Sequence, residues 1–115
     1  MRTVSVQDAV AMIPDGATLM IGGFMAVGTP ERLLDELVRQ RKRNLTIIAN
    51  DTARPGQGIG KLVDAGLVSR TIASHIGLNP ETQRQMIAGK MSVDQVLKDS
   101  QAAVNRAVKA AGYEK

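Results

Sequence analysis

Cysteine is absent from this chain and histidine occurs once, at His75. Without cysteine the chain has no disulfide framework and no thiolate ligands, and a single histidine cannot build a multi-histidine centre, so we expect no metal site. Aromatic residues are limited to Phe24 and Tyr113. The core must therefore consist of aliphatic side chains, and the stacking surfaces typical of nucleic-acid binders are missing.

Long apolar runs are also missing: none approaches the roughly 20 residues that a membrane-spanning helix needs. The first residues lack the charged-then-apolar pattern of a signal peptide. We therefore expect a cytoplasmic protein with no membrane partner. The formal net charge of +4 is mild. Its densest cluster, Arg39 with residues 41–43, suits the negative end of a helix better than a nucleic-acid surface.

The apolar residues that are present follow helix and strand periods. Residues 5–13 predict a helix capped by Ser5, and the turn at residues 14–16 ends it. Residues 17–21 and 45–49 are short apolar runs, typical of parallel strands buried on both faces. Between them, the helix-opening sequence Thr29-Pro30-Glu31 lets Thr29 cap a helix. Residues 17–49 therefore predict a strand, a loop, a helix and a second strand.

The rest of the chain repeats this alternation. We expect a short helix over residues 59–65, a third strand over residues 70–73 and a helix that opens at Asn79 and ends at Gly89. The predicted fold class is α/β: a small three-layer open parallel sheet with an amphipathic C-terminal helix.

A glycine loop joins the first strand to its helix, with glycines at positions 22, 23 and 28. Glycine lets a ligand approach the backbone closely, and the following helix directs its free amides and positive dipole end at the loop. Such a loop suits an anionic group, although tight turning and packing alone explain the glycines equally well. The spacing is not Gly-x-Gly-x-x-Gly, and no Gly-Lys-Ser/Thr ending follows, so neither a dinucleotide site nor a P-loop is supported.

Residues 15–30, DGATLMIGGFMAVGTP, fill every fixed place of one motif. They resemble the signature of family I coenzyme A transferases: an acidic residue or Asn, Gly, two variable positions, three apolar residues, Gly-Gly-Phe, three variable positions, Gly, any residue and Pro. The similarity runs from residue 1 to about residue 91 and is to the alpha subunit of the acetate/acetoacetate type. Segments LTIIANDTA, IASHIGLNPET and MIAGKM continue it.

The resemblance implies a mechanism shared between two subunits. A glutamate carboxylate of a beta subunit attacks an acyl-CoA, passes through a mixed anhydride to a glutamyl-CoA thioester, and CoA then moves to an acceptor carboxylic acid. The alpha subunit supplies part of the CoA site at the interface. The resemblance assigns CoA binding to the loop and two polar residues after the second strand: Gly22, Gly23, Phe24, Met25, Ala26, Val27, Gly28, Asn50 and Asp51. It implies no catalytic residue in this chain.

Several of these positions have a structural interpretation as well. Asn50 and Asp51 are also typical of a turn after a strand. Phe24 either covers the pantetheine arm or fills the core beneath the loop, and its residue type alone favours the core. A lone histidine such as His75 is more often structural than catalytic.

Two parts of the family pattern are absent. No Ser-Glu-Asn-Gly segment carries a catalytic glutamate, and no Pro-Gln-Gly-Thr loop follows Met91. Residues 92–115 instead open with a capping box at Ser92 and Gln95, which predicts a helix, and resemble the C-terminal helix of sugar-type ABC-transporter solute-binding proteins. We therefore expect a CoA-transferase-like domain over residues 1–91 and a helical tail over residues 92–115, in a truncated or chimeric gene.

An incomplete sheet leaves an open edge, which predicts self-association into a homo-oligomer. The tail either covers part of the exposed apolar surface or pairs with another copy. The main functional hypothesis is an alpha-subunit-like protein that carries the CoA loop and needs a beta subunit. The alternative is a non-catalytic binding or interaction module, or a fusion product without transferase activity.

Overall fold

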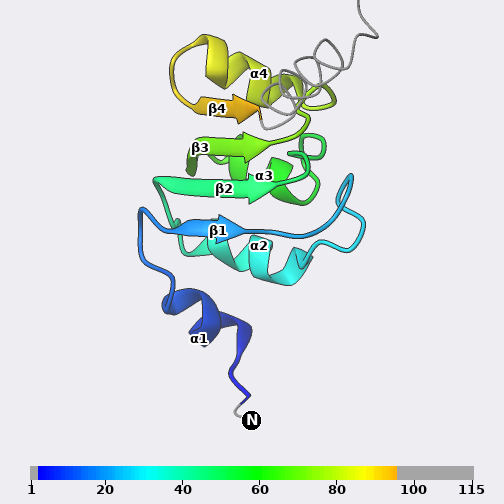
Figure 1. Cartoon of the computed structure of the whole chain (residues 1–115). Helices are drawn as coiled ribbons and strands as arrows, with labels where there is room; N and C mark the ends of the chain where they lie inside the picture. Colours follow the sequence, from blue (N-terminus) through cyan, green and yellow to red (C-terminus); the bar gives the residue numbers. More distant parts are fainter. Residues whose placement is uncertain (1–2, 96–115) are drawn as a thin grey trace, which may run out of the picture.

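The computed structural model describes residues 3–95, which alternate between helices and strands along the chain. Helices and strands follow one another in the order shown in Figure 1. The elements are α1 (Val6–Ala11), β1 (Thr18–Met20), α2 (Glu31–Arg39), β2 (Leu45–Ala49), α3 (Ile59–Asp64), β3 (Val68–Ala73), α4 (Pro80–Ile87) and β4 (Ser92–Gln95).

Local sequence signals place the helix ends. The Ser5 hydroxyl accepts a hydrogen bond from the Asp8 amide at 3.1 Å, and the Asn79 side chain caps α4 by accepting one from the Thr82 amide at 3.1 Å. Both caps are confirmed. The Thr29 cap is wrong: Pro30 takes the N-cap position of α2, and the Thr29 hydroxyl instead donates to the carbonyl of Gly22.

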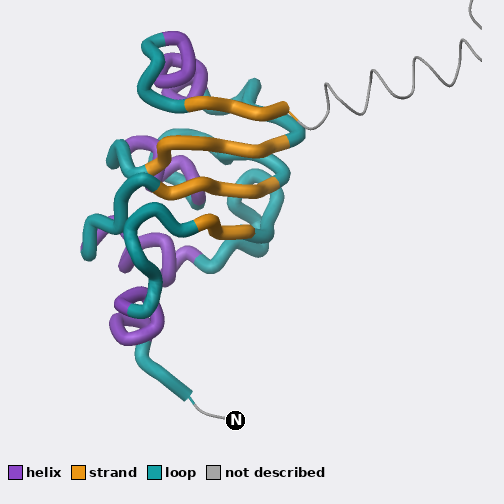
Figure 2. Tube along the Cα trace, turned by 60° about the vertical axis from the view of Figure 1, so that its left-hand side comes forward, coloured by secondary structure: helices purple, strands orange, loops and turns teal. Residues whose placement is uncertain are grey.

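The four strands form one parallel sheet in the order β1-β2-β3-β4. This confirms an α/β fold with an open parallel sheet. Figure 2 shows that the helices gather on one side of the strands. Crossover connections between parallel strands share one hand, so a strand order that advances in a single direction places every crossover helix on the same face. Within residues 3–95 the sheet is covered on one face, so these residues form two layers of the three-layer fold that we expected.

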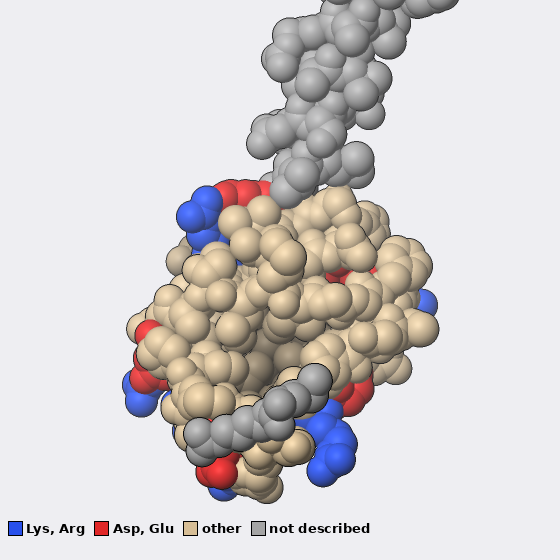
Figure 3. Space-filling model, turned by 60° about the horizontal axis from the view of Figure 1, so that its bottom comes forward, with Lys and Arg blue, Asp and Glu red and all other residues tan. Residues whose placement is uncertain are grey.

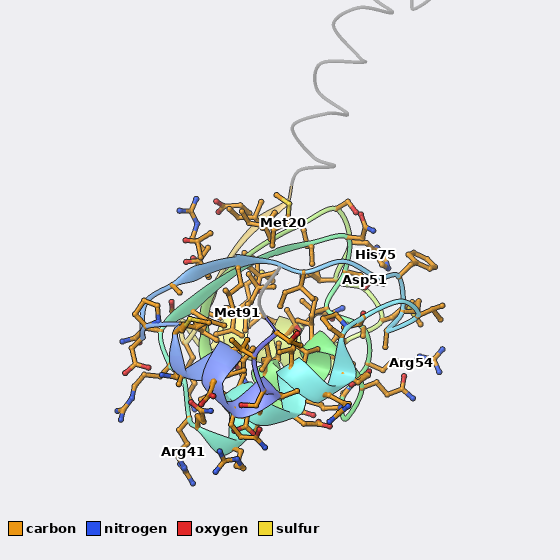
Figure 4. All side chains as sticks on the ribbon, turned by 90° about the horizontal axis from the view of Figure 1, so that it is seen from below. Met20, Arg41, Asp51, Arg54, His75 and Met91 are labelled. Carbon is orange, nitrogen blue, oxygen red and sulfur yellow. The ribbon has the colours of Figure 1, made fainter. Side chains whose placement is uncertain are left out.

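The covered face of the sheet, the inner face, carries the core. Leu45 and Ile47 of β2 are fully buried, and Leu34 of α2 and Leu62 of α3 pack against that face. Figure 4 places Met91 between the sheet and the helices, and its side chain is 3% exposed. Aliphatic residues alone build this core, as the scarcity of aromatics predicts.

The opposite, outer face of the sheet is formed by two rows of residues that cross the strands. The row Met20, Ile48, Ile72 and Asp94 is mostly apolar, and the row Thr18, Thr46, Arg70 and Ser92 is mostly polar. Met20 is 80% exposed, so the prediction that the first strand is buried on both faces is wrong. Arg70 and Asp94 form an ion pair across β3 and β4.

Two helices share the pattern Glu-x-x-Arg-Gln, and in each the glutamine bonds to the preceding helix. In α2, Glu36 accepts hydrogen bonds from Arg39 and from the Gln40 amide at 2.8 Å, and that amide also donates to the Gln7 carbonyl of α1 at 3.0 Å. In α4, the Glu81 carboxylate likewise accepts hydrogen bonds from Arg84 and from the Gln85 amide. The Gln85 amide also donates to the Val63 carbonyl of α3 at 2.8 Å. We call these two arrangements the helix clamps.

Strand β1 lies at an open edge of the sheet, beside an apolar pocket of about 270 Å³. Figure 3 shows a hollow in a surface made mostly of uncharged residues. Residues of α1, β1 and α2 line the pocket, among them Ile13, Leu19 and Leu33, and Gly22 lies at one end. The open edge agrees with an incomplete sheet.

The segment after Met91 departs from its predicted structure. Ser92–Gln95 is strand β4, which pairs in parallel with β3, so the helix that the capping box predicts does not begin at Ser92. Pairing with the neighbouring strand overrides the local capping signal. The remaining tail prediction falls on residues 96–115, outside the described residues. None of the helices described within residues 3–95 is long and apolar enough to cross a membrane.

Candidate functional site

The candidate site lies at the edge of the sheet where β1, β2 and β3 end. The loop of residues 21–30 follows β1, the loop of residues 50–58 follows β2, and Ser74 and His75 follow β3. In Figure 1 these segments meet at the arrowhead end of the strands. The Asn50 carbonyl accepts hydrogen bonds from the amides of Ser74 and His75, both at 3.1 Å, which joins two of the three segments.

The glycine loop contains a tight two-residue turn at Met25 and Ala26. Phe24 and Val27 pair with each other through both backbone hydrogen bonds, at 3.0 and 2.8 Å. Met25 and Ala26 have φ of 53° and 69°, the left-handed region that side chains rarely adopt. Because such conformations persist only where the surroundings impose them, their presence here marks a loop whose shape is specified.

Gly23 is required by the geometry of the loop. Its φ is 115°, and a Cβ at this position would lie 2.1 Å from the Thr29 hydroxyl oxygen. Gly22 differs: its φ is ordinary, and no atom lies within 4 Å of where its Cβ would be. The fold therefore requires a glycine at Gly23 but not at Gly22, whose bare backbone faces open space.

The side chains of the turn point outward. Phe24 is 64% exposed and Val27 is 77% exposed. Phe24 therefore does not fill the core beneath the loop. Large apolar side chains that the fold leaves exposed are available to contact a ligand.

Several amides of the loop are free to bind a ligand. Within residues 3–95, the amides of Gly22, Gly23, Ala26 and Gly28 donate no hydrogen bond. The loop runs directly into α2, whose N-terminus has no side-chain cap. Amides at a helix start attract anionic or partly negative oxygen atoms, as in a phosphate or a thioester carbonyl.

The side chains of Asn50 and Asp51 hydrogen-bond to the backbone of the glycine loop. The Asn50 side-chain amide donates to the Gly23 carbonyl at 3.2 Å, and the Asp51 carboxylate accepts from the Met25 amide at 3.2 Å. Asp51 is only 5% exposed and also accepts from the Ala53 amide. Asn50 and Asp51 therefore both hydrogen-bond to the glycine loop, and Asp51 does so from a buried position.

A buried polar network behind Asp51 fixes the second loop. Thr52, Asn79 and Thr82 are fully buried. The Asn79 amide donates to the Thr52 carbonyl at 2.9 Å, and the Thr82 hydroxyl donates to that of Thr52 at 3.0 Å. Sequence analysis missed this network, because it found only the capping role of Asn79. The clustering of Thr52, Asn79 and Thr82 is visible only once α4 is seen to pack against the loop.

An ion-pair cluster joins the start of α2 to α3. Lys61 pairs with Glu31 and Asp35, and the lysine–Asp35 distance is 2.7 Å. Hydrogen bonds to Asp35 and then Glu31 raise the pKa of Lys61 above its usual value. Glu31 also accepts from the Gly58 amide at 3.0 Å, so this cluster fixes the distance between the two loops.

His75 and Arg54 are exposed near the same end of the molecule. Figure 4 shows His75, Asp51 and Arg54 at the same end of the molecule, with Arg54 projecting outward, while Arg41 lies at the opposite end. The His75 ring lies over Gly77, where a Cβ would come within 2.7 Å of it. Within the described residues no group of three or more potential metal-ligating side chains occurs.

Comparison with known proteins identifies the family. The family model described as coenzyme A transferase matches residues 3–112. The chain belongs to the coenzyme A transferase family. It is 52% identical over 92 residues to the acetate CoA-transferase subunit alpha of Escherichia coli, a match that covers 80% of this chain and 42% of that protein. It is 49% identical over 80 residues to the acetoacetyl-CoA:acetate/butyrate CoA transferase alpha subunit of Clostridium acetobutylicum, covering 70% and 37%.

Solved structures of the family share the fold. A variant of the decarboxylase AibA/AibB superimposes with a TM-score of 0.66 and 32% identity, covering 82% of this chain and 38% of that chain. An acyl-CoA transferase from Escherichia coli O157:H7, solved as a thioester complex with CoA, superimposes with a TM-score of 0.61 and 28% identity, covering 79% and 20%. The chain therefore spans about two fifths of the length of the curated alpha subunits it matches.

Proposed function

We propose that the chain is a CoA-transferase alpha-type protein whose glycine loop, residues 22–28, binds the CoA part of an acyl-CoA. The observation that carries the proposal is the exposed loop at Gly22, with its free amides, held in a specified shape by Asn50 and Asp51. On this proposal the amides bind an oxygen of the CoA chain, and Phe24 covers its pantetheine arm.

The reaction that this site serves is transfer of CoA between an acyl-CoA and a short-chain carboxylic acid. The relatives with 52% and 49% identity are named as CoA-transferase alpha subunits, which favours this reaction over the decarboxylation catalysed by the structural neighbour. A beta subunit supplies the nucleophilic glutamate, since no Ser-Glu-Asn-Gly segment occurs in this sequence. We place the protein in the cytoplasm, where acyl-CoA pools and such a partner are available.

Thermal unfolding with and without CoA tests the loop assignment. A ligand that binds only the folded protein stabilises it by about 2.7 kcal/mol at 100 times its Kd, which shifts Tm by roughly 10 °C in a domain of this size. We expect CoA to raise Tm and an equal concentration of acetate to leave it unchanged. A folded protein whose Tm is the same with saturating CoA contradicts the proposal.

Gly22→Val sharpens this test. Because no atom lies within 4 Å of the Gly22 Cβ position, valine fits the fold but occupies the space where a ligand would approach. We expect the Tm without ligand to stay within about 2 °C and the CoA-dependent shift to disappear. Ala65→Val, an equally small exposed change at the end of α3, is the matched control and keeps the shift.

The beta-subunit requirement has its own test. The chain alone should transfer no CoA, and co-expression with a CoA-transferase beta subunit should restore turnover that Gly22→Val abolishes. Binding of CoA without turnover in the co-expressed pair would support the alternative, a non-catalytic binding module. A stable complex of two identical chains would support the homo-oligomer that the open sheet edge predicts.

A further inference from the structure

The apolar pocket beside strand β1 is continuous with the proposed CoA site. Gly22 and Pro30, both in the loop of residues 21–30, form part of its wall, together with residues of α1, β1 and α2. Ligand sites are usually concave and mostly apolar, with a few polar groups that orient the ligand. The pocket is therefore a candidate site for the part of an acyl-CoA that the glycine loop does not bind, which is the acyl chain.

The pocket extends along α2, away from the glycine loop. Its wall includes Pro30, just before α2, and Leu37, near the end of that helix. At a rise of 1.5 Å per residue these two positions lie about 10 Å apart along the helix axis. Ala9 of α1 also lines the pocket, and the first helix clamp holds α1 beside the C-terminal end of α2. A chain that enters beside Gly22 therefore has room to extend toward Leu37.

The lining of the pocket suits an uncharged, apolar chain. Every lining residue is aliphatic, methionine, glycine or proline, so no charged side chain of residues 3–95 belongs to the wall. The pocket volume is about 270 Å³. An engineered aliphatic cavity of roughly 150 Å³ binds benzene, so a chain of about six carbons fits here. A carboxylate in the same place would lose its hydration without gaining a partner.

The polar group at the entrance is the backbone amide of Gly22. The Ile21 amide donates to the Ile48 carbonyl of β2 at 3.0 Å. Because successive amides along a strand point to opposite sides, the Gly22 amide is directed away from β2, toward the open edge where the pocket lies. This amide donates no hydrogen bond within residues 3–95. It suits the carbonyl oxygen of a thioester.

We propose that this pocket binds the acyl chain of the acyl-CoA and selects unbranched, uncharged chains such as butyryl and hexanoyl. The inference rests on the proposed function, since it places the thioester carbonyl at the Gly22 amide and the CoA part along the glycine loop. The alkyl chain then extends between β1 and α2 toward Leu37. Leu19 of β1 and Leu33 of α2 contact it from two sides.

Binding of CoA thioesters to the full chain tests this proposal. Calorimetry compares the Kd of CoA with those of its acetyl, butyryl, hexanoyl and succinyl thioesters. Burial of each methylene should tighten binding about fourfold, so butyryl-CoA should bind roughly tenfold more tightly than acetyl-CoA. Hexanoyl-CoA should bind more tightly still. Succinyl-CoA, whose chain ends in a carboxylate, should bind no more tightly than acetyl-CoA.

Two changes in the pocket wall should remove the preference for longer chains. Leu33→Gln adds a polar group to the wall and should bring the Kd values of acetyl-CoA and hexanoyl-CoA within about twofold of each other. Ala9→Leu fills the end of the pocket far from Gly22, so it should weaken hexanoyl-CoA about tenfold and butyryl-CoA less than about twofold. The unfolding transition of each variant without ligand shows that it is folded.

Leu78→Gln is the matched control for Leu33→Gln. Leu78 is 42% exposed and Leu33 is 37% exposed, but Leu78 lies outside the pocket. The ratio of the acetyl-CoA and hexanoyl-CoA Kd values should therefore stay as in the natural chain. Loss of the ratio in this control as well would overturn the assignment to the pocket.

The remaining outcomes separate this proposal from the CoA-loop assignment. Equal Kd values for CoA and all its thioesters overturn the acyl pocket and leave the loop assignment intact, whereas failure of every ligand to bind overturns both. A preference for hexanoyl-CoA that survives both Leu33→Gln and Ala9→Leu also overturns the acyl pocket. So does a preference that disappears as the protein concentration rises, since a second copy then occupies the pocket.

Discussion

The two loops at the candidate site differ in how they are held, and the difference separates surface from scaffold. In the glycine loop, Phe24 and Val27 are exposed and several amides are free. In the loop of residues 50–58, Asp51, Thr52 and Ala53 are 5%, 0% and 3% exposed. The first loop leaves part of its backbone exposed, whereas the polar groups of the second loop are used in hydrogen bonds that fix both loops. The exposed glycine loop can keep its shape because the loop beside it is buried and hydrogen-bonded.

The largest expected effect comes from Gly60, which lies under the second loop. A Cβ at Gly60 would lie 1.9 Å from the Arg54 carbonyl oxygen, so Gly60→Ala must displace the loop backbone. We expect a loss of about 3 kcal/mol in the free energy of unfolding, measured by urea denaturation. Gly22→Ala, where the new methyl meets nothing, should change it by less than about 0.5 kcal/mol. If Gly60→Ala and Gly22→Ala lowered the free energy of unfolding equally, the contrast between a tightly packed second loop and an open glycine loop would be wrong.

The next effect concerns the network behind Asp51. Asn79→Ala removes the cap of α4 and leaves the Thr52 carbonyl buried without its donor, which should cost about 2 kcal/mol. Asn79→Asp keeps an oxygen that caps the Thr82 amide but loses the donor to Thr52. We therefore expect Asn79→Asp to be less stable than the natural protein. Equal stability of the two would show that only the cap of α4 contributes.

Substitution of Asp51 should lower the free energy of unfolding by a smaller amount and should also weaken CoA binding. Asp51→Asn replaces one of the two oxygens that accept from the Met25 and Ala53 amides, so we expect a loss of about 1 kcal/mol. Because the turn at Met25 then loses its anchor, CoA affinity measured by calorimetry should fall about fivefold. The control is Asp64→Asn. The Asp64 carboxylate accepts a hydrogen bond from the Gly56 amide in an exposed part of the loop of residues 50–58. This variant should leave CoA affinity unchanged.

The smallest effect is a pH dependence that arises away from the loops. Hydrogen bonds from Arg39 and then Gln40 lower the pKa of Glu36 to about 2. Since this value lies below that of an unfolded glutamate, the stabilisation is complete above about pH 4.5 and is lost as the pH falls toward 2. Tm should therefore drop between pH 5 and pH 3, and the drop should be smaller in Glu36→Gln. Asp8→Asn, an exposed change in α1, should retain the full drop.

The sequence predicts the local elements well, because their signals are local. Ser5 and Asn79 cap helices as expected, and the apolar runs after residues 17 and 45 pair as parallel strands. Ser92 shows the limit of such signals. Residues 92–95 fit both a helix-capping box and the start of a strand. Pairing with β3 stabilises the strand.

The sequence indicates which residues belong to the candidate site, but not which of them are exposed and which are buried. The resemblance assigns the glycine loop, Asn50 and Asp51 to one CoA site, and in the structure both side chains hydrogen-bond to that loop. Residue type alone favours a buried Phe24, yet the turn at Met25 and Ala26 turns that ring outward. The buried position of Asp51 could not be predicted, since aspartate after a strand is usually exposed in a turn.

The helix clamps have a consequence for how the molecule comes apart. Glu81 in the second clamp has its pKa lowered to about 2 by Arg84 and then Gln85, which matches Glu36 in the first. Acid should therefore weaken the two helix clamps over the same span of pH. Reporters placed on α1 and on α4 should therefore show the same acid midpoint, because the carboxylate that each clamp depends on has its pKa lowered alike.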